Sequence, residues 1–323
     1  MEMGSLIIDL EGIIISPLER DFLLHPAVGG VILFARNYAS RDQLKSLCNS
    51  IRMVRSAPIL IMVDQEGGRV QRFVSEFTQI SPMANFGKLY DVYPEQACFA
   101  TRECGKVLAQ ELLSAGLDLT LAPVVDLRKN NHSVIGDRAF HANPIIVAQL
   151  AYSLILGMSI VGMAATAKHF PGHGSVTLDS HTSLPVDERL LHEVESEDLQ
   201  PFIYLIQNNL QAIMTAHILF PNIDSQPVTF SHFWLQEILR KKMGFTGAIF
   251  SDDLNMAGAN ISLNYGDRVT ASREAGCDFA LLCNNPQGVA QALDQLNPKL
   301  YRSDRARADL LFPRSLKKDI VNA

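Results

Sequence analysis

Short apolar runs that each end in polar residues recur eight times along this 323-residue chain and constrain its fold more than any other feature. These runs are Ser5–Leu10, Gly30–Phe34, Pro58–Val63, Leu117–Val125, Ala164–Ala167, Ala212–Ala216, Gly247–Phe250 and Asp278–Leu282. Most of them are unbroken rather than alternating, which is typical of strands buried on both faces of a parallel sheet. The chain is therefore expected to build a parallel sheet covered by helices.

Segments with helical periodicity lie between the apolar runs. They are Arg41–Arg55, Pro94–Ala115, Pro144–Met163, Glu195–Asn209, Phe233–Met243 and Tyr265–Ala275. Eight β–α units in about 300 residues, without a linker, predict one α/β domain over residues 1–323, a single (β/α)8 TIM barrel. An open doubly wound sheet is the alternative, although no Gly-x-Gly-x-x-Gly follows the first run. The tail from Pro298 is basic, and we expect a solvated last helix and a frayed end there.

Composition excludes several classes of function. The net charge of −6 gives no basic footprint for nucleic acid. Five cysteines, an odd number without a Cys-x-x-Cys pair, favour a reducing compartment over a disulfide framework. The N-terminus lacks the features of a signal peptide, and no apolar run is long enough to cross a bilayer. We expect a monomeric cytoplasmic protein that binds neither nucleic acid nor membrane.

In a (β/α)8 barrel, the polar residues that follow the strands gather at the C-terminal face, where the active sites of such barrels lie. The densest group belongs to the stretch from Ala164 to His181, and consists of Lys168, His169, His173, Asp179 and His181. Other groups end neighbouring runs: Asp64 and Glu66, Asp126, His217, and the pair Asp252–Asp253. Arg72 and Arg138 add fixed donors suited to hydroxyl and carboxylate groups.

Each candidate also has a structural interpretation. Asp252 and Asp253 could cap a helix, although two adjacent carboxylates at a strand end indicate a site, with one of them available as a nucleophile. Asp179 could form a surface turn, or it could orient the imidazole of His181 and raise its basicity. Lys168 leaves a buried strand, so it requires either a buried ion pair or a substrate.

Two reaction classes can use this set of residues. A metal-dependent hydrolase would bind zinc through His169, His173, His181 and the aspartates. A retaining glycoside hydrolase would need a carboxylate on one face of the sugar and an acid/base on the other, about 5 Å apart. A sugar-binding barrel without catalytic activity is the non-enzymatic alternative.

Four motifs carry a resemblance to a known family. They are VDQEGGRVQRF at 63–73, IGDRAFH at 135–141, AKHFPGHGSVTLDSH at 167–181 and FSDDLNM at 250–256. In their order and content the chain resembles the β-N-acetylglucosaminidases of glycoside hydrolase family 3, the bacterial peptidoglycan-recycling β-hexosaminidases. The resemblance implies a single barrel that needs no metal or other cofactor and acts on N-acetylglucosamine-containing muropeptides.

The resemblance also implies roles for eight residues. Asp252 matches the catalytic nucleophile, His181 the acid/base, and Asp179 the partner of that histidine. The residues that match those holding the N-acetylglucosamine are Asp64, Arg72, Arg138, Lys168 and His169. Substrate-assisted catalysis by the 2-acetamido group and phosphorolysis are the variants of the mechanism that stay open.

Overall fold

Eight parallel strands form the wall of a barrel in the computed structural model, which describes residues 3–129, 134–176, 180, 183–297 and 301–314. The strands are β1 (Leu6–Asp9), β2 (Val28–Leu33), β3 (Leu60–Val63), β6 (Leu119–Thr120), β7 (Thr166–Phe170), β8 (Ala212–Thr215), β9 (Ala248–Asp253) and β10 (Phe279–Leu281). They pair in the order β6-β3-β2-β1-β10-β9-β8-β7. Parallel bridges Leu119–Ala164 and Val124–Lys168 join the β6 segment to β7 and nearly close the ring. The predicted (β/α)8 barrel is confirmed.

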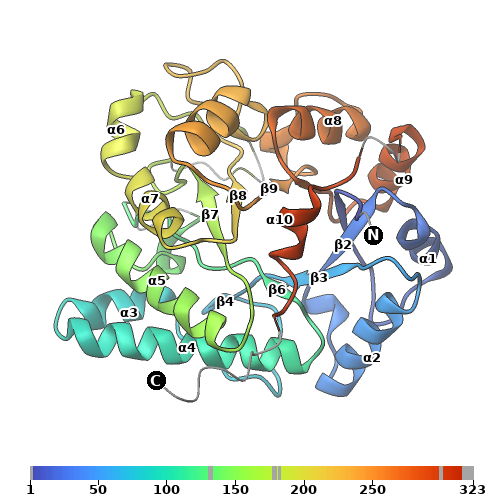
Figure 1. Cartoon of the computed structure of the whole chain (residues 1–323), viewed down its shortest axis with the longest axis horizontal. Helices are drawn as coiled ribbons and strands as arrows, with labels where there is room; N and C mark the ends of the chain where they lie inside the picture. Colours follow the sequence, from blue (N-terminus) through green and yellow to red (C-terminus); the bar gives the residue numbers. More distant parts are fainter. Residues whose placement is uncertain (1–2, 130–133, 177–179, 181–182, 298–300, 315–323) are drawn as a thin grey trace.

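Helices surround this ring (Figure 1). They are α1 (Pro17–Leu24), α2 (Arg41–Arg52), α3 (Met83–Tyr90), α4 (Pro94–Ser114), α5 (Pro144–Ile160), α6 (Leu191–Ser196), α7 (Leu199–Gln207), the π-helix η4 (Phe233–Lys242), α8 (Tyr265–Ala275), α9 (Pro286–Gln295) and α10 (Arg305–Asp309). The predicted helix 195–209 is wrong at its start, because the structure has two helices there, with Glu197 outside helical geometry between them. Within the described residues, no helix has the length and apolar character needed to span a membrane.

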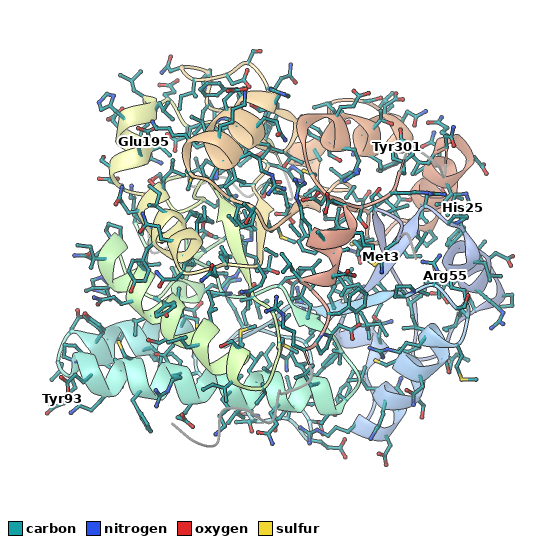
Figure 2. The ribbon with its side chains drawn as sticks, viewed as in Figure 1. Met3, His25, Arg55, Tyr93, Glu195 and Tyr301 are labelled. Carbon is teal, nitrogen blue, oxygen red and sulfur yellow. The ribbon has the colours of Figure 1, made fainter. Side chains whose placement is uncertain are left out.

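The barrel interior has its own apolar cluster, separate from the larger core between strands and helices. Seven of the eight strands contribute residues to it, all except β7, and Phe250 and Phe279 stack there with ring centroids 5.0 Å apart. Ala308 and Leu311 join the same cluster from the C-terminal segment, beside Met3. Figure 1 shows α10 over the middle of the barrel, and Figure 2 shows Met3 next to it.

The position of α10 corrects the expectation of a solvated last helix. Ala308 and Leu311 are buried because they seal the end of the barrel at which the strands begin. The helix keeps a basic side, from which Arg307 donates to Asp278 at 2.8 Å. The open end of the barrel is therefore the C-terminal one, where the strands deliver their polar residues.

Candidate active site

A cavity of about 460 Å³ opens at the C-terminal ends of the strands. Its polar lining includes Asp64, Glu66, Arg72, Arg138, Lys168, His169, His173, Ser180, Asp252 and Asp253. Six of the eight predicted site residues thus share one cavity. The other two, Asp179 and His181, lie outside the described residues.

A hairpin after β3 builds one wall of this cavity. Its strands are β4 (Gln65–Gly67) and β5 (Val70–Gln71), and Gly67 at the end of β4 and Gly68 in the turn have φ angles of 114° and 55°. Such left-handed conformations favour glycine because it has no Cβ. The side-chain oxygen of Gln65 accepts hydrogen bonds from the N–H groups of Arg72 and Phe73, at 2.8 and 3.1 Å. The hairpin thereby fixes Glu66 and Arg72 at the cavity.

Glu66 is the centre of a buried ion-pair network. Its carboxylate accepts two hydrogen bonds of 2.8 Å from Arg138 and lies 2.7 Å from the ammonium of Lys168. Lys168 also reaches Asp64 at 2.7 Å, whereas the contact from Arg72 to Asp64 is longer, at 3.4 Å. Lys168 and Arg138 are therefore in buried ion pairs already, and Arg72 is the most loosely held of the three cations.

The charges in this network sustain one another. Burial alone would raise the pKa of Glu66, but Lys168 and Arg138 hold that pKa well below its usual range. Burial alone would lower the pKa of Lys168, but Asp64 and Glu66 raise it. Glu66 and Lys168 are therefore both ionised at neutral pH. The arrangement presents fixed charges to the cavity, which can hydrogen-bond the hydroxyl groups of a sugar.

Asp126 lies behind the cavity at the end of the β6 segment. Its carboxylate contacts His169 Nδ1 at 2.7 Å and accepts a hydrogen bond from the N–H of His173, also at 2.7 Å. The ring of His173 in turn contacts the hydroxyl of Ser180 at 3.3 Å. Burial lowers the pKa of His173, so that its ring is neutral near pH 7.

The pKa values of the two adjacent aspartates at the end of β9, Asp252 and Asp253, are shifted in opposite directions. Burial would raise the pKa of Asp252, but the nearby imidazoles of His169 and His217 and other neighbours lower it. For Asp253, burial wins over hydrogen bonds from the N–H groups of Asn255 and Cys283, and its pKa is raised to about 7. Asp252 is therefore the carboxylate available as a nucleophile, whereas Asp253 is the proton-binding member of the pair.

Ser180, which lies between Asp179 and His181 in the sequence, contacts two other parts of the chain. The hydroxyl of Ser180 contacts His173, and its carbonyl accepts a 2.9 Å hydrogen bond from the N–H of Gly258, in the segment after Asp252. Gly258 also packs against His217, whose ring contacts the carbonyl oxygen of Asp253 at 3.0 Å.

A metal site has less support among the described residues. They contain no group of three or more His, Cys, Asp or Glu side chains able to hold an ion. His169 and His173 lie with their ring centroids 6.0 Å apart, and each is engaged with another side chain, Asp126 and Ser180 respectively.

The sequence predicted no specific role for Glu66 and Asp126, and it offered His173 only as a zinc ligand. All three lie in or beside the motifs or at the end of an apolar run, so their position was visible. Their partners were not, because contacts such as Glu66–Arg138 join residues 72 positions apart. One signal was available: Lys168 and Arg138 were both candidates, but Asp64 was the only carboxylate predicted beside them. Two buried cations need a second carboxylate to neutralise their charge.

An ionised carboxylate at a barrel mouth, set among fixed charged donors, is an arrangement that a barrel glycoside hydrolase can use. Residues 7–307 match the glycosyl hydrolase family 3 N terminal domain, and the chain belongs to that family.

Similar proteins narrow the activity within glycoside hydrolase family 3. The beta-hexosaminidase of Thiobacillus denitrificans is 48% identical over 307 residues, which cover 95% of this chain and 86% of that protein. That of Tolumonas auensis is 49% identical over 304 residues, covering 94% and 90%. Native NagZ from Neisseria gonorrhoeae is similar in structure, with a TM-score of 0.90 and 40% identity, covering 97% of this chain and 91% of that one. The chain is thus a glycoside hydrolase of the β-N-acetylhexosaminidase class, as predicted.

The Neisseria gonorrhoeae protein has also been solved in complex with N-trifluoroacetyl-D-glucosamine and, separately, with a zinc ion. These complexes describe that protein's ligands.

Proposed function

We propose that this enzyme is a retaining exo-β-N-acetylglucosaminidase that removes non-reducing terminal N-acetylglucosamine from muropeptides, that is, from N-acetylglucosaminyl-β-1,4-anhydro-N-acetylmuramyl peptides. The observation that carries the proposal is the electrostatic difference between Asp252 and Asp253 in a cavity lined by ion-paired donors. A nucleophilic carboxylate must be ionised at working pH, and Asp252 meets that condition.

In the proposed mechanism, Asp252 attacks the anomeric carbon while protonated His181 donates its proton to the leaving oxygen. Asp179 stabilises the imidazolium before this transfer. The neutral His181 then takes a proton from water, which attacks the glycosyl-enzyme and releases the sugar with its original anomeric configuration. One group acts as acid and then as base, so its pKa should lie near working pH.

Five residues are proposed to hold the sugar: Asp64, Arg72, Arg138, Lys168 and His169. Asp64 and Lys168 face the cavity as an ion pair, which offers a carboxylate acceptor beside an ammonium donor. Arg138 is rigid because Glu66 binds its guanidinium through two hydrogen bonds. The complex of the Neisseria gonorrhoeae relative with an N-acylated glucosamine supports a sugar of this class.

The muropeptide aglycone rests on the family resemblance of the four motifs. A cytoplasmic location fits this substrate class, and the five free cysteines support a reducing compartment. Hydrolysis of an aryl β-N-acetylglucosaminide beside the matching glucoside tests the glycone. An enzyme that cleaves the glucoside equally well is not the one proposed.

Covalent trapping tests the mechanism. A fluorinated N-acetylglucosaminide with a good leaving group should label Asp252, and peptide mapping by mass spectrometry identifies the labelled residue. A label elsewhere refutes the proposed nucleophile, and the absence of any protein adduct favours attack by the 2-acetamido group. Comparing the products with and without inorganic phosphate separates hydrolysis from phosphorolysis, since only phosphorolysis yields a sugar phosphate.

A further inference from the structure

Asp126 has a fully buried carboxylate, which makes three interactions with one short segment. One oxygen accepts hydrogen bonds from the backbone N–H groups of His169 and His173, at 3.2 and 2.7 Å. The other oxygen lies 2.7 Å from Nδ1 of the His169 ring. A single side chain thus fixes both the backbone and the imidazole of His169.

These contacts determine which nitrogen of His169 carries a proton. Burial would raise the pKa of Asp126, but His169, His173 and the hydrogen bonds lower it, so the group is an ionised acceptor. A carboxylate without a proton can only accept, so the Nδ1 atom at 2.7 Å must donate. The second ring nitrogen, Nε2, is then left for the cavity that His169 lines.

We propose that Asp126 is a positioning residue for the reaction, because it keeps Nδ1 of His169 protonated and thereby presents Nε2 to the sugar in a fixed orientation. This inference rests on the proposed function, in which His169 contacts the sugar. It assigns to the barrel a second carboxylate–imidazole pair, Asp126–His169, in which His169 belongs to β7.

The substitution Asp126→Asn distinguishes this role from simple packing. The two backbone N–H donors cannot change, so the oxygen of the new amide must stay with them. The NH₂ group of the new side chain then faces Nδ1 of His169. Because this group donates a hydrogen bond, Nδ1 must be the acceptor and cannot carry a proton. The proton of a neutral ring moves to Nε2, with little change in volume.

Nitrogen-15 NMR of histidine-labelled protein reads this change directly. The His169 signals are assigned by their absence from the His169→Ala spectrum, since the chain has nine histidines. We expect Nδ1 to be protonated in the wild type and unprotonated in Asp126→Asn. An unprotonated Nδ1 in the wild type overturns the proposal even if the variant does not fold, and so does a folded variant that keeps the proton on Nδ1.

Kinetics test whether Asp126 acts through His169. Asp126→Asn should lower kcat/KM for an aryl β-N-acetylglucosaminide about 10- to 100-fold, the effect typical of losing the outer partner of a functional histidine. In a His169→Ala background the same substitution should change kcat/KM by less than about threefold, because coupled residues are not additive. Fully additive losses overturn the proposal.

Asp118→Asn is the matched control. Asp118 is also buried, accepts a 2.9 Å hydrogen bond from a backbone N–H, that of Ile61, and lies before β6 at the other end of the barrel. Its substitution should leave both the His169 proton and kcat/KM unchanged. Wild-type protein that fails to cleave the glycoside contradicts the proposed function, whereas the NMR result still tests the Asp126–His169 pair.

Discussion

The ammonium of Lys168 lies 2.7 Å from a carboxylate oxygen of Glu66, and both side chains are only 3% exposed. Arg138 binds the same carboxylate through two hydrogen bonds. Glu66 therefore neutralises two cations that are proposed to hold the sugar. Removing its charge would leave Lys168 and Arg138 with less compensation in a buried site, which is far more costly than losing an exposed ion pair.

We therefore expect Glu66→Gln to lower the free energy of unfolding by about 3–5 kcal/mol and to weaken sugar binding. Urea unfolding and KM for an aryl β-N-acetylglucosaminide measure the two effects. Glu237→Gln is the control, because it removes the exposed Glu237–Lys241 pair and should cost less than about 0.5 kcal/mol. Equal stability losses in the two variants would contradict this account of the network.

Replacing the proposed nucleophile should separate chemistry from binding. Asp252→Asn keeps the size of the side chain but removes the charge, so kcat should fall by about 10⁴-fold or more, as for other covalent nucleophiles. Binding of N-acetylglucosamine, measured by calorimetry, should change less than tenfold. Asp253→Asn is the neighbouring control. If it lowers kcat more than Asp252→Asn does, the nucleophile is Asp253 and the proposed assignment to Asp252 is wrong.

The barrel could be predicted from the sequence because its cause is local. Most strands come from a short, mainly apolar run, such as Ala212–Ala216, that is followed by a polar residue, here His217, and then by helical periodicity. The seal at α10 could not be predicted from the sequence. Ala308 and Leu311 are two apolar residues in a basic tail, and they are buried only because they pack near Met3, at the opposite end of the chain.

The site could be predicted as a set of residue types but not as a set of contacts. Asp64, Lys168 and Asp252 stand out because they end buried strands. The pairing of Lys168 with Glu66 joins residues from β7 and β4, and the difference between Asp252 and Asp253 depends on neighbours supplied by other strands. Such properties arise only when the barrel closes.

The raised pKa of Asp253 predicts a pH dependence of stability. Because its pKa is about 7 in the folded protein, against 3.8 for the ordinary side chain, the native state binds more protons than the unfolded state between these values. The stabilisation from this group is therefore complete below about pH 4 and is lost as the pH rises through about 7.

Urea unfolding at pH 5 and pH 8 measures this loss. Asp253→Asn keeps an oxygen that can accept from the N–H groups of Asn255 and Cys283 but cannot ionise. From pH 5 to pH 8, the free energy of unfolding of the variant should rise by about 1–3 kcal/mol relative to that of the wild type, because only the wild type loses the stabilisation from Asp253. If wild type and variant change in parallel, the pKa of Asp253 is not raised.

Metal removal tests the zinc-hydrolase alternative. The proposed mechanism uses carboxylates and an imidazole, so prolonged treatment with a chelator should leave hydrolysis of an aryl β-N-acetylglucosaminide unchanged, and added zinc should not increase it. A zinc-dependent aminopeptidase treated in parallel verifies that the chelation worked. Loss of activity with the chelator, restored by zinc, would replace the proposed mechanism with a metal-dependent one.

Gly258 packs so closely against Ser180, which lines the cavity, that a single methyl group there should disturb the proposed catalytic segment. A Cβ at this position would lie 2.9 Å from the Cβ of His217 and 3.2 Å from the carbonyl oxygen of Ser180. The neighbours must therefore shift, and Ser180 stands between Asp179 and His181. We expect Gly258→Ala to lower kcat about 10- to 100-fold, since misplacement by about 1 Å has effects of that size.

The same substitution should cost only about 1–3 kcal/mol of stability, as other overpacking changes do. Gly12→Ala is the matched control, because a Cβ at Gly12 would meet nothing within 4 Å. Steady-state kinetics at a temperature where both variants remain folded isolates the effect on catalysis. If Gly258→Ala lowers stability but keeps the kcat of Gly12→Ala, the contact between Gly258 and Ser180 supports the fold alone and does not position the acid/base.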